Sequence, residues 1–327
     1  MHSMTRRTLL IALAAFGTTF ATPVLAQADY PSKSIKFIVP YAAGGLPDTV
    51  ARIVAQRLGD KLGQSVVVDN RPGANGGVAA GVLASAAADG YQFLVTDGSM
   101  MSINPLLYSK LTYNPKTDFV PVALIARAPL FLALNPAKMP PNTMAEFVAY
   151  VKSKPGALNY VSSGIGSTHH LTMESMKHVL GLDITHVPYK GTGQSVPALV
   201  SGQVEMLFSA YPSLVGFVKD GRVKLIATNS AQRSSLAPNL PAISEVIPGF
   251  DFAPIVGILA PAGTPSAIIQ KVAAAAQEAS KQPDAVAAFN AAGIDVVAAG
   301  PQDYAKAIEA ENERYAKAIA AAGIKKE

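Results

Sequence analysis

The chain has 327 residues, of which half are hydrophobic and 15% are charged. This composition supports one large or two medium domains with real cores and excludes a disordered chain. Cysteine is absent, which excludes disulfides, thiolate metal sites and cysteine nucleophiles. The net charge is +5, and without the first 26 residues 25 basic residues face 22 acidic ones, an excess too small to predict a nucleic-acid partner.

The first 26 residues have the order of an export signal. Arg6 and Arg7 precede an apolar run from Leu9 to Phe20, and small residues end the segment at Ala26. The run is too short to be a comfortable membrane span. The sequence therefore predicts cleavage after Ala26 and a free periplasmic protein. The arginine pair leaves open whether export follows the general secretory or the twin-arginine route.

Strands and helices are predicted to alternate along the first part of the mature chain. Period-two and 3.6-residue apolar patterns, separated by glycine and proline turns, place the elements. In order, they are a strand over Ile35–Val39, a helix over 49–62 that Asp48 can cap, a strand over 65–69, a helix to about Ala87 and a strand over 92–96. The alternation predicts a parallel α/β sheet.

The same alternation recurs in a second unit. Its predicted elements are strands over 158–162, 184–188, 204–208 and 223–228, with helices over 169–180 and 195–201. Two longer extended segments, 121–135 and 250–261, join the units, so one domain is expected to be discontinuous. The expected domain one comprises 27–126 and 254–327, with a tail helix from Pro301 to about Ala322, and domain two comprises 127–253.

Three loops share one layout, in which a strand leads through glycines to the start of a helix. They are Tyr41–Asp48, Ser162–Thr168 and Tyr189–Gln194. Free N–H groups and the helix dipole at such a start favour an anion. In open α/β sheets these loops lie at the carboxyl ends of the strands, where ligands bind. Two domains with facing loops are therefore predicted to clamp a small anion.

Motifs for catalysis and for metal binding are weak. The chain has no G-x-S-x-G and no Walker lysine loop. His169 and His170 lack a second well-spaced pair of metal ligands, and the sequence places no carboxylate to orient a histidine beside Ser163 or Ser167. We therefore expect no metal, no cofactor and no enzyme activity. A periplasmic hydrolase built on the same cleft stays an alternative.

Arg127 interrupts an otherwise apolar extended run, Val122–Leu132, where the chain crosses between the domains. A guanidinium there needs an anionic partner, and its forked donors suit a carboxylate. The sequence leaves two partners open, which are a ligand carboxylate and an acid of the protein itself.

Short strings along the whole mature chain resemble one family. They are Tyr30-Pro31, Gly44-Gly45-Leu46-Pro47-Asp48, Asn70-Arg71-Pro72-Gly73-Ala74, Asp89-Gly90-Tyr91, Ile103-Asn104-Pro105, Lys154-Pro155-Gly156, Ser163-Gly164-Ile165-Gly166-Ser167, His186-Val187-Pro188-Tyr189-Lys190-Gly191, Gly202-Gln203-Val204 and Leu259-Ala260-Pro261-Ala262-Gly263-Thr264-Pro265. Together they resemble the Bug-type (Bordetella uptake gene) periplasmic solute-binding proteins of tripartite tricarboxylate transporters. The resemblance implies a type 2 periplasmic-binding fold, with two α/β domains around a ligand cleft joined by two crossover strands.

The resemblance also implies where a ligand binds. In the family, two loops hold one carboxylate, largely through backbone N–H groups and ordered waters. The corresponding residues are Tyr41, Gly44, Gly45 and Asp48 from domain one and Ser162, Ser163, Gly164, Gly166 and Ser167 from domain two, with His170, Tyr189, Lys190 and Gly191 nearby. The implied partners are a small organic carboxylate and a membrane permease with one large and one small subunit. A receptor that presents its ligand to a membrane kinase is the alternative role, and a monomer is expected.

Two departures from the family pattern bear on the ligand. Ser209 stands where many members have an acid, and Arg127 stands where many have a small residue. Together they suggest a second carboxylate, so a dicarboxylate is predicted. Tyr41 and Tyr211 could stack on a flat ring, which makes an aromatic diacid such as terephthalate one candidate. Linear diacids and citrate-like acids remain open.

Overall fold

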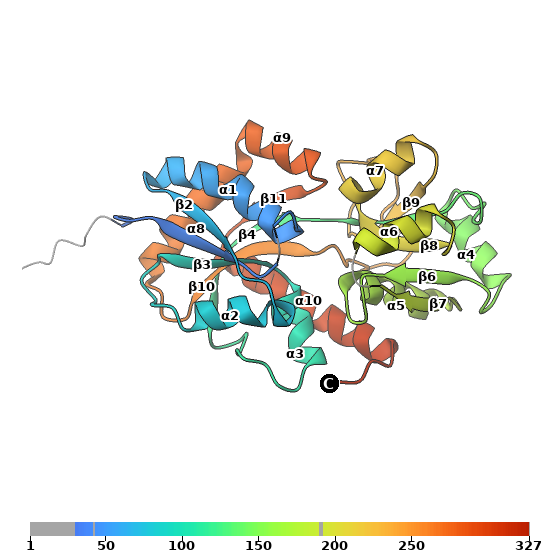
Figure 1. Cartoon of the computed structure of the whole chain (residues 1–327), viewed down its shortest axis with the longest axis horizontal. Helices are drawn as coiled ribbons and strands as arrows, with labels where there is room; N and C mark the ends of the chain where they lie inside the picture. The colour runs from blue at the N-terminus through green and yellow to red at the C-terminus, as the bar shows by residue number, and fades with distance from the viewer. Residues whose placement is uncertain (1–29, 42, 190–191, 327) are drawn as a thin grey trace, which may run out of the picture.

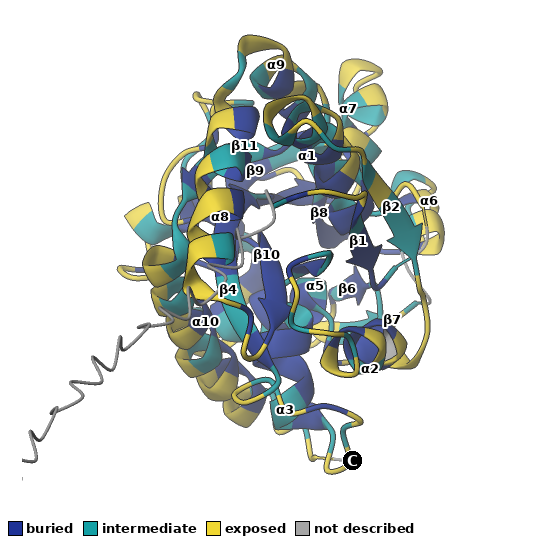
Figure 2. Ribbon diagram, turned by 90° about the vertical axis from the view of Figure 1, so that its left-hand side faces the viewer, coloured by how far each residue is buried: buried dark blue, intermediate teal, exposed yellow. Residues whose placement is uncertain are grey.

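A computed structural model describes residues 30–41, 43–189 and 192–326, which form two α/β lobes lying side by side (Figure 1). The predicted signal segment 1–26 and, in the third predicted loop, Lys190 and Gly191 lie outside the described residues. Each lobe is built around its own sheet. In Figure 2 the strands of both sheets are largely buried, whereas the helices that cover them expose their outer faces.

The first lobe contains a six-stranded sheet with the order β11-β4-β10-β3-β1-β2. The strands are β1 (Ile35–Val39), β2 (Val66–Asn70), β3 (Gln92–Asp97), β4 (Phe119–Arg127), β10 (Ile255–Pro261) and β11 (Asp295–Ala299). β1 pairs parallel with β2 and β3, but β10 pairs antiparallel with β3 and β4. The three strands from which a parallel sheet was predicted are therefore parallel, and β10, which enters from the other lobe and runs against β3 and β4, makes the sheet as a whole mixed.

The second lobe contains a five-stranded sheet with the order β7-β6-β8-β5-β9. The strands are β5 (Leu130–Leu134), β6 (Asn159–Ser162), β7 (Thr185–Pro188), β8 (Met206–Ala210) and β9 (Lys224–Thr228). β6 pairs parallel with β7 and β8, whereas β5 is antiparallel to β8 and β9. The chain leaves the first sheet after Arg127, enters the second at Leu130 and returns at Ile255. These are two crossovers, as predicted.

Helices cover both sheets. Those of the first lobe are α1 (Leu46–Leu62), α2 (Gly77–Ala84), α3 (Asn104–Leu107), α8 (Ser266–Lys281) and α9 (Pro283–Ala291), and those of the second are α4 (Met144–Lys152), α5 (Thr168–Leu180), α6 (Thr192–Val200) and α7 (Tyr211–Lys219). The predicted helical period is visible in α1, which buries Val50, Val54 and Leu58. None of the helices in the described part of the chain is both long and apolar enough to span a bilayer.

The last helix, α10 (Pro301–Ala321), packs on both lobes. Tyr304 and Ile308 on its first turns belong to the core of the first lobe. Tyr315 and Ile319, three turns later, belong to the core of the second. The sequence predicts packing on domain one, which Tyr304 and Ile308 confirm. The further contact with the second lobe was not predicted, because a 3.6-residue pattern shows which face is apolar but not which lobe that face contacts.

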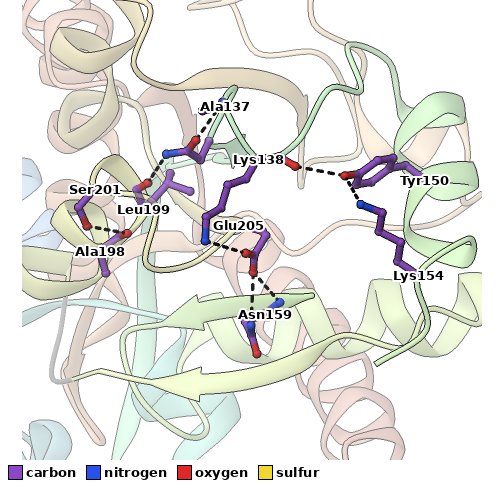
Figure 3. Close-up of polar contacts among 10 residues, drawn as sticks. Ala137, Lys138, Tyr150, Lys154, Asn159, Ala198, Leu199, Ser201 and Glu205 are labelled. Carbon is purple, nitrogen blue, oxygen red and sulfur yellow. Dashed lines mark hydrogen bonds and ion pairs between the residues drawn. The ribbon is translucent and has the colours of Figure 1, made fainter. Parts of the chain in front are cut away.

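A side-chain network closes the end of the second sheet that faces away from the first lobe (Figure 3). Glu205, which precedes β8, accepts hydrogen bonds from the backbone N–H of Asn159 at 2.9 Å and from its side-chain amide at 3.4 Å. Its other oxygen pairs with Lys138 Nζ at 3.3 Å. Asn135, which follows β5, donates to the carbonyl oxygen of Leu199 at 2.8 Å. The starts of β6 and β8 and the end of β5 are thus tied together.

Candidate ligand cleft

Two adjoining cavities lie between the lobes. The smaller chamber has a volume of about 310 Å³ and the larger chamber about 410 Å³. Both are lined by Asp97, Thr168 and His169, so they form one cleft with two chambers. A third cavity of about 670 Å³ lies between α5, α10 and the segment 247–252, and it is lined by none of the predicted site residues.

The smaller chamber lies between the β6–α5 loop and the first lobe. Besides the three shared residues, its walls are Tyr41, Ser99, Ile103, Leu107 and Tyr108 from the first lobe and Ser163, Ile165, Gly166 and Ser167 from the second. The N–H groups of Ser163, Thr168 and His169 have no acceptor among the described residues. This chamber therefore offers backbone donors to a ligand anion.

The larger chamber lies where four helices begin. Its walls include Gly45 and Leu46 at the start of α1, Thr168 at the start of α5, Thr192 at the start of α6 and Pro212 in the first turn of α7. Each helix N-terminus carries about half a positive charge. No lysine or arginine among the described residues lines either chamber. Among the described lining residues, helix dipoles and N–H groups are the sources of positive potential.

Asp48 holds the β1–α1 loop from behind. Its Oδ2 accepts a hydrogen bond from the N–H of Gly44 at 2.8 Å, and its Oδ1 accepts one from Asn70 Nδ2 at 2.9 Å. Burial opposes its charge, but the hydrogen bonds from Arg52 and Gly44 lower the pKa of Asp48. Gly44 has a φ of +84°, which favours glycine. The predicted ligand residue Asp48 thus orients this loop and does not line the cleft.

Ser162 and Ser167 shape the β6–α5 loop. Ser162 Oγ contacts both the N–H and the carbonyl oxygen of Gly164, at 3.1 and 3.0 Å. Ser167 caps α5, because its Oγ accepts from the N–H of His170 at 3.3 Å. Gly166 has a φ of +74°, and a Cβ there would come within 2.3 Å of Leu107 Cδ1. This glycine therefore lets the second lobe approach the first at the edge of the smaller chamber.

A buried aromatic stack supports the same loop. His170 Nδ1 accepts a hydrogen bond from the N–H of Gly166 at 3.1 Å, and its ring centroid lies 4.0 Å from that of His186. His186 stacks in turn on Tyr160 at 4.8 Å, and its Nε2 contacts Ser162 Oγ at 2.7 Å. Burial lowers the pKa of His170 and lowers that of His186 to about 4. Both rings are therefore neutral at neutral pH and act as hydrogen-bond partners.

His169, not His170, lines the cleft. Its Nδ1 contacts Ser163 Oγ at 3.0 Å, and burial lowers its pKa to about 4. Consecutive residues of a helix point about 100° apart, so one of the two histidines faces the cleft and the other the core. The cap at Ser167 sets which one, and the sequence does not show how the helix is rotated against the sheet.

Asp97 is the main lining residue that the sequence analysis missed. It ends β3, and its Oδ1 accepts hydrogen bonds from Tyr41 OH at 3.1 Å and from the N–H of Ser99 at 3.0 Å. The available signal was its position, because β3 runs parallel to β1 and both end at the same edge of the sheet. A polar residue at that strand end was therefore a candidate.

Arg127 is paired with an acid of the protein. Its Nη1 lies 2.5 Å from Asp251 Oδ2, and it lines neither chamber. The sequence had left a ligand carboxylate and a protein acid open as partners, and the structure contains the second. Ser209 is fully buried, and its Oγ contacts Ser213 Oγ at 2.8 Å. A second carboxylate on the ligand was inferred from Arg127 and Ser209. Neither residue lines the cleft, so neither supports that inference.

The two remaining tyrosines also lie outside the chambers. The Tyr211 ring packs on Phe131, with centroids 5.3 Å apart. The Tyr189 hydroxyl is 3.5 Å from Gln203 Oε1. Of the predicted pair that would stack on a flat ring, Tyr41 lines the smaller chamber and Tyr211 does not.

The fourteen predicted ligand residues thus fall into three groups. Six line the cleft, namely Tyr41, Gly44, Gly45, Ser163, Gly166 and Ser167. Four support the loops from behind, namely Asp48, Ser162, Gly164 and His170. Four have other surroundings, namely Arg127, Tyr189, Ser209 and Tyr211. Within the described chain, no cluster of three or more histidine and acidic side chains is arranged to hold a metal ion.

Comparison with known proteins shows that this chain is similar to solute receptors. The model of the tripartite tricarboxylate transporter family receptor matches residues 50–324. Protein BugT of Bordetella pertussis is 33% identical over 325 residues, covering 99% of each chain. Rpa4515 of Rhodopseudomonas palustris, solved with adipate, is 33% identical with a TM-score of 0.78 over 90% of this chain and 99% of its own. MatC from the same organism, solved with malate, is 32% identical with a TM-score of 0.73, over 89% and 100%.

Proposed function

The chain belongs to the receptor family of the tripartite tricarboxylate transporters, and we propose that it captures a small organic dicarboxylate in the periplasm and delivers it to a membrane permease with a large and a small subunit. Membership confirms the predicted Bug-type resemblance and type 2 periplasmic-binding fold. It also identifies the chain as a solute-binding receptor and not an enzyme, so the hydrolase alternative is set aside.

The observation that carries the proposal is the convergence of four helix N-termini on the larger chamber, with no described lysine or arginine lining it. An anion in this chamber gains from the dipoles of α1, α5, α6 and α7 and can accept hydrogen bonds from backbone N–H groups. Micromolar binding corresponds to about −8 kcal/mol. A few charge-assisted hydrogen bonds of roughly 1.5–3 kcal/mol each are enough to supply this after the costs of association.

The two-chamber shape supports a ligand with two polar ends. The chambers meet at Asp97, Thr168 and His169, so one molecule can place one end in each. The related receptors solved with adipate and with malate hold dicarboxylates of different length. Because Tyr41 still offers one aromatic face in the smaller chamber, terephthalate belongs on the ligand panel.

Isothermal titration with dicarboxylates, monocarboxylates and amino acids tests the ligand class. We expect at least one dicarboxylate to bind with micromolar affinity or better and simple monocarboxylates to bind more weakly. Binding of amino acids without any dicarboxylate would refute the proposal.

Delivery is tested in cells of the source bacterium. Deleting the gene should abolish uptake of the radiolabelled ligand, and the mature protein should appear in the periplasmic fraction without residues 1–26. Normal uptake combined with loss of ligand-induced gene expression would instead support the role of a sensor that acts with a membrane kinase.

A further inference from the structure

One carboxylate of the protein stands at the junction of the two chambers. Asp97 ends β3 in the first lobe and lines both cavities, beside Thr168 and His169 of the second lobe. It is the one acidic residue among the described residues that line either chamber. A ligand that reaches from one chamber to the other must therefore pass this carboxylate.

The carboxylate of Asp97 is held in one orientation and can accept further hydrogen bonds. Tyr41 OH and the N–H of Ser99 both donate to Oδ1, at 3.1 and 3.0 Å. The Ser99 hydroxyl also interacts with this carboxylate, and apart from it no described residue donates to Oδ2. An ionised carboxylate accepts about four hydrogen bonds, so Asp97 can take further donors from the cleft side.

The surroundings of Asp97 do not neutralise its charge. On the cleft side no described cation lines the chambers, and His169 is neutral because burial lowers its pKa. On the protein side the nearest ionisable groups are acids and phenols, namely Glu311, Tyr41, Tyr113, Tyr304 and Tyr315. Arg314 acts on Glu311 from the next turn of α10, but it is not among the groups that act on Asp97. Burial accordingly raises the pKa of Asp97, a sign that its charge lacks a partner.

A ligand group placed against Oδ2 therefore decides affinity. A bare carboxylate there would put two negative charges together in a partly desolvated cleft, which opposes binding. A hydroxyl or an ammonium would donate a further hydrogen bond to Oδ2, and a site built to accept from a donor rejects analogues without it strongly.

On the basis of the proposed function, we propose that Asp97 makes the receptor select dicarboxylates that carry a hydrogen-bond donor, a hydroxyl or an ammonium group, over their unsubstituted parents. The helix N-termini hold the ligand's carboxylates, and Asp97 recognises the substituent between them. Asp97 is then a specificity residue, whereas the loops supply the general affinity for acids.

Matched ligand series test this assignment by isothermal titration. The series are succinate, malate and aspartate, then glutarate, 2-hydroxyglutarate and glutamate, then adipate, 2-hydroxyadipate and 2-aminoadipate. Each is titrated into the wild type, Asp97→Asn and the control Asp220→Asn, which changes an exposed acid at the end of α7. Asparagine keeps an Oδ1 that can accept from Tyr41 and Ser99, so the loop should stay folded.

In the wild type we expect one substituted diacid to bind at least tenfold more tightly than its parent. In Asp97→Asn this ratio should fall at least fivefold, mainly because the parent binds better, and Asp220→Asn should keep the wild-type ratio. Which substituent wins identifies the donor. Equal or tighter binding of the parents to the wild type overturns the inference while leaving the dicarboxylate receptor intact, and so does an unchanged ratio in Asp97→Asn. If no member of any series binds, the inference fails, whereas the dicarboxylate class itself fails only if the wider panel with terephthalate also shows no binding.

Discussion

The two ends of the second lobe's sheet differ in whether their polar groups have hydrogen-bond partners within the protein. At the far end, Glu205 takes two hydrogen bonds from Asn159 and an ion pair from Lys138, so its polar atoms are satisfied within the protein (Figure 3). At the cleft end, the N–H groups of Ser163 and His169 have no acceptor among the described residues. Buried polar groups are normally paired, so unpaired donors that face a cavity indicate a binding surface. Paired polar groups therefore stabilise the fold, whereas unpaired donors in the cleft are available to a ligand.

The largest effect on stability is expected when the hydrogen-bond network at the far end of the sheet is disrupted. Glu205→Ala leaves the N–H and the amide of Asn159 and the ammonium of Lys138 without an acceptor. We expect the free energy of unfolding to fall by about 3 kcal/mol, measured by urea denaturation, because both donors of Asn159 lose their buried acceptor, whereas water can solvate the half-exposed Lys138. Ligand affinity should change less than twofold. The control Glu313→Ala removes an exposed acid and should leave both quantities unchanged.

A second buried glutamate extends the comparison, because no ion pair among the described residues offsets the cost of burying its charge. Glu311 is fully buried beneath the cleft, where its carboxyl group touches Gly98 and contacts Ser102 Oγ at 3.3 Å. Burial raises its pKa to about 8. Between its ordinary pKa near 4.5 and this value, the folded state holds a proton that the unfolded state has released, so stability falls as the pH rises through this window.

Glu311→Gln removes this dependence. We expect the variant to be about 2 kcal/mol more stable than the wild type at pH 6 and equally stable at pH 4, measured by urea denaturation at both pH values. Glu309→Gln, on an exposed face of the same helix, should follow the wild type at both. A variant that is less stable than the wild type at pH 6 would mean that the charged form of Glu311 is stabilised by the fold.

At the cleft end, Gly166→Ala should impair binding more than folding. The added Cβ would meet Leu107 Cδ1 at 2.3 Å, across the boundary between the lobes. We expect ligand affinity to fall at least tenfold in calorimetry, which is about 1.4 kcal/mol, because the lobes can no longer approach at the smaller chamber.

Gly181→Ala is the matched control. Gly181 lies at the C-terminal end of α5, the helix that follows Gly166, and has a φ of +61°. Alanine therefore has a similar backbone strain there, but its Cβ would have no neighbour within 4 Å. It should lower the unfolding free energy by about 1 kcal/mol and leave affinity unchanged. Equal losses of affinity in both variants would show that backbone strain, and not the contact with Leu107, is responsible.

Local patterns predicted the architecture well, because strand and helix periods are written in neighbouring residues. The strand Ile35–Val39 was predicted with its observed bounds, and α5 was predicted to begin one residue later than it does. The direction of β10 was not predictable in the same way. It depends on which strands the returning strand pairs with. Those are β3 and β4, whose paired residues Asp97 and Arg127 lie more than a hundred residues away in sequence.

Residues that line the cleft were predictable where backbone conformation places them and not where side-chain direction does. The glycines at 44, 45 and 166 were found because glycine before a helix indicates an anion loop. Arg127 was assigned a possible ligand because its partner, Asp251, comes from a distant segment. Asp97 was missed because a single acid at a strand end has no motif. Which partner Arg127 takes and which strand-end side chain lines the cleft are both set by the packing of distant segments, and a local pattern does not contain this information.

The smallest of these effects tests whether the support behind the cleft depends on pH. His186 is neutral in the fold, where burial and then the neighbouring His170 lower its pKa to about 4, and its Nε2 contacts Ser162 Oγ at the base of the β6–α5 loop. Between about pH 4 and 6.5 the unfolded state binds a proton that the folded state does not, so stability is lost as the pH falls through this window. Because the ring is partly exposed, we expect a loss of about 1 kcal/mol between pH 7 and pH 5, less than the full shift would give. His186→Gln should show a smaller loss, whereas His178→Gln, which changes an exposed histidine on α5, should match the wild type. If His186→Gln and the wild type lose stability equally, the ring is not what links this loop to pH, and the acid-sensitive element must lie elsewhere in the fold.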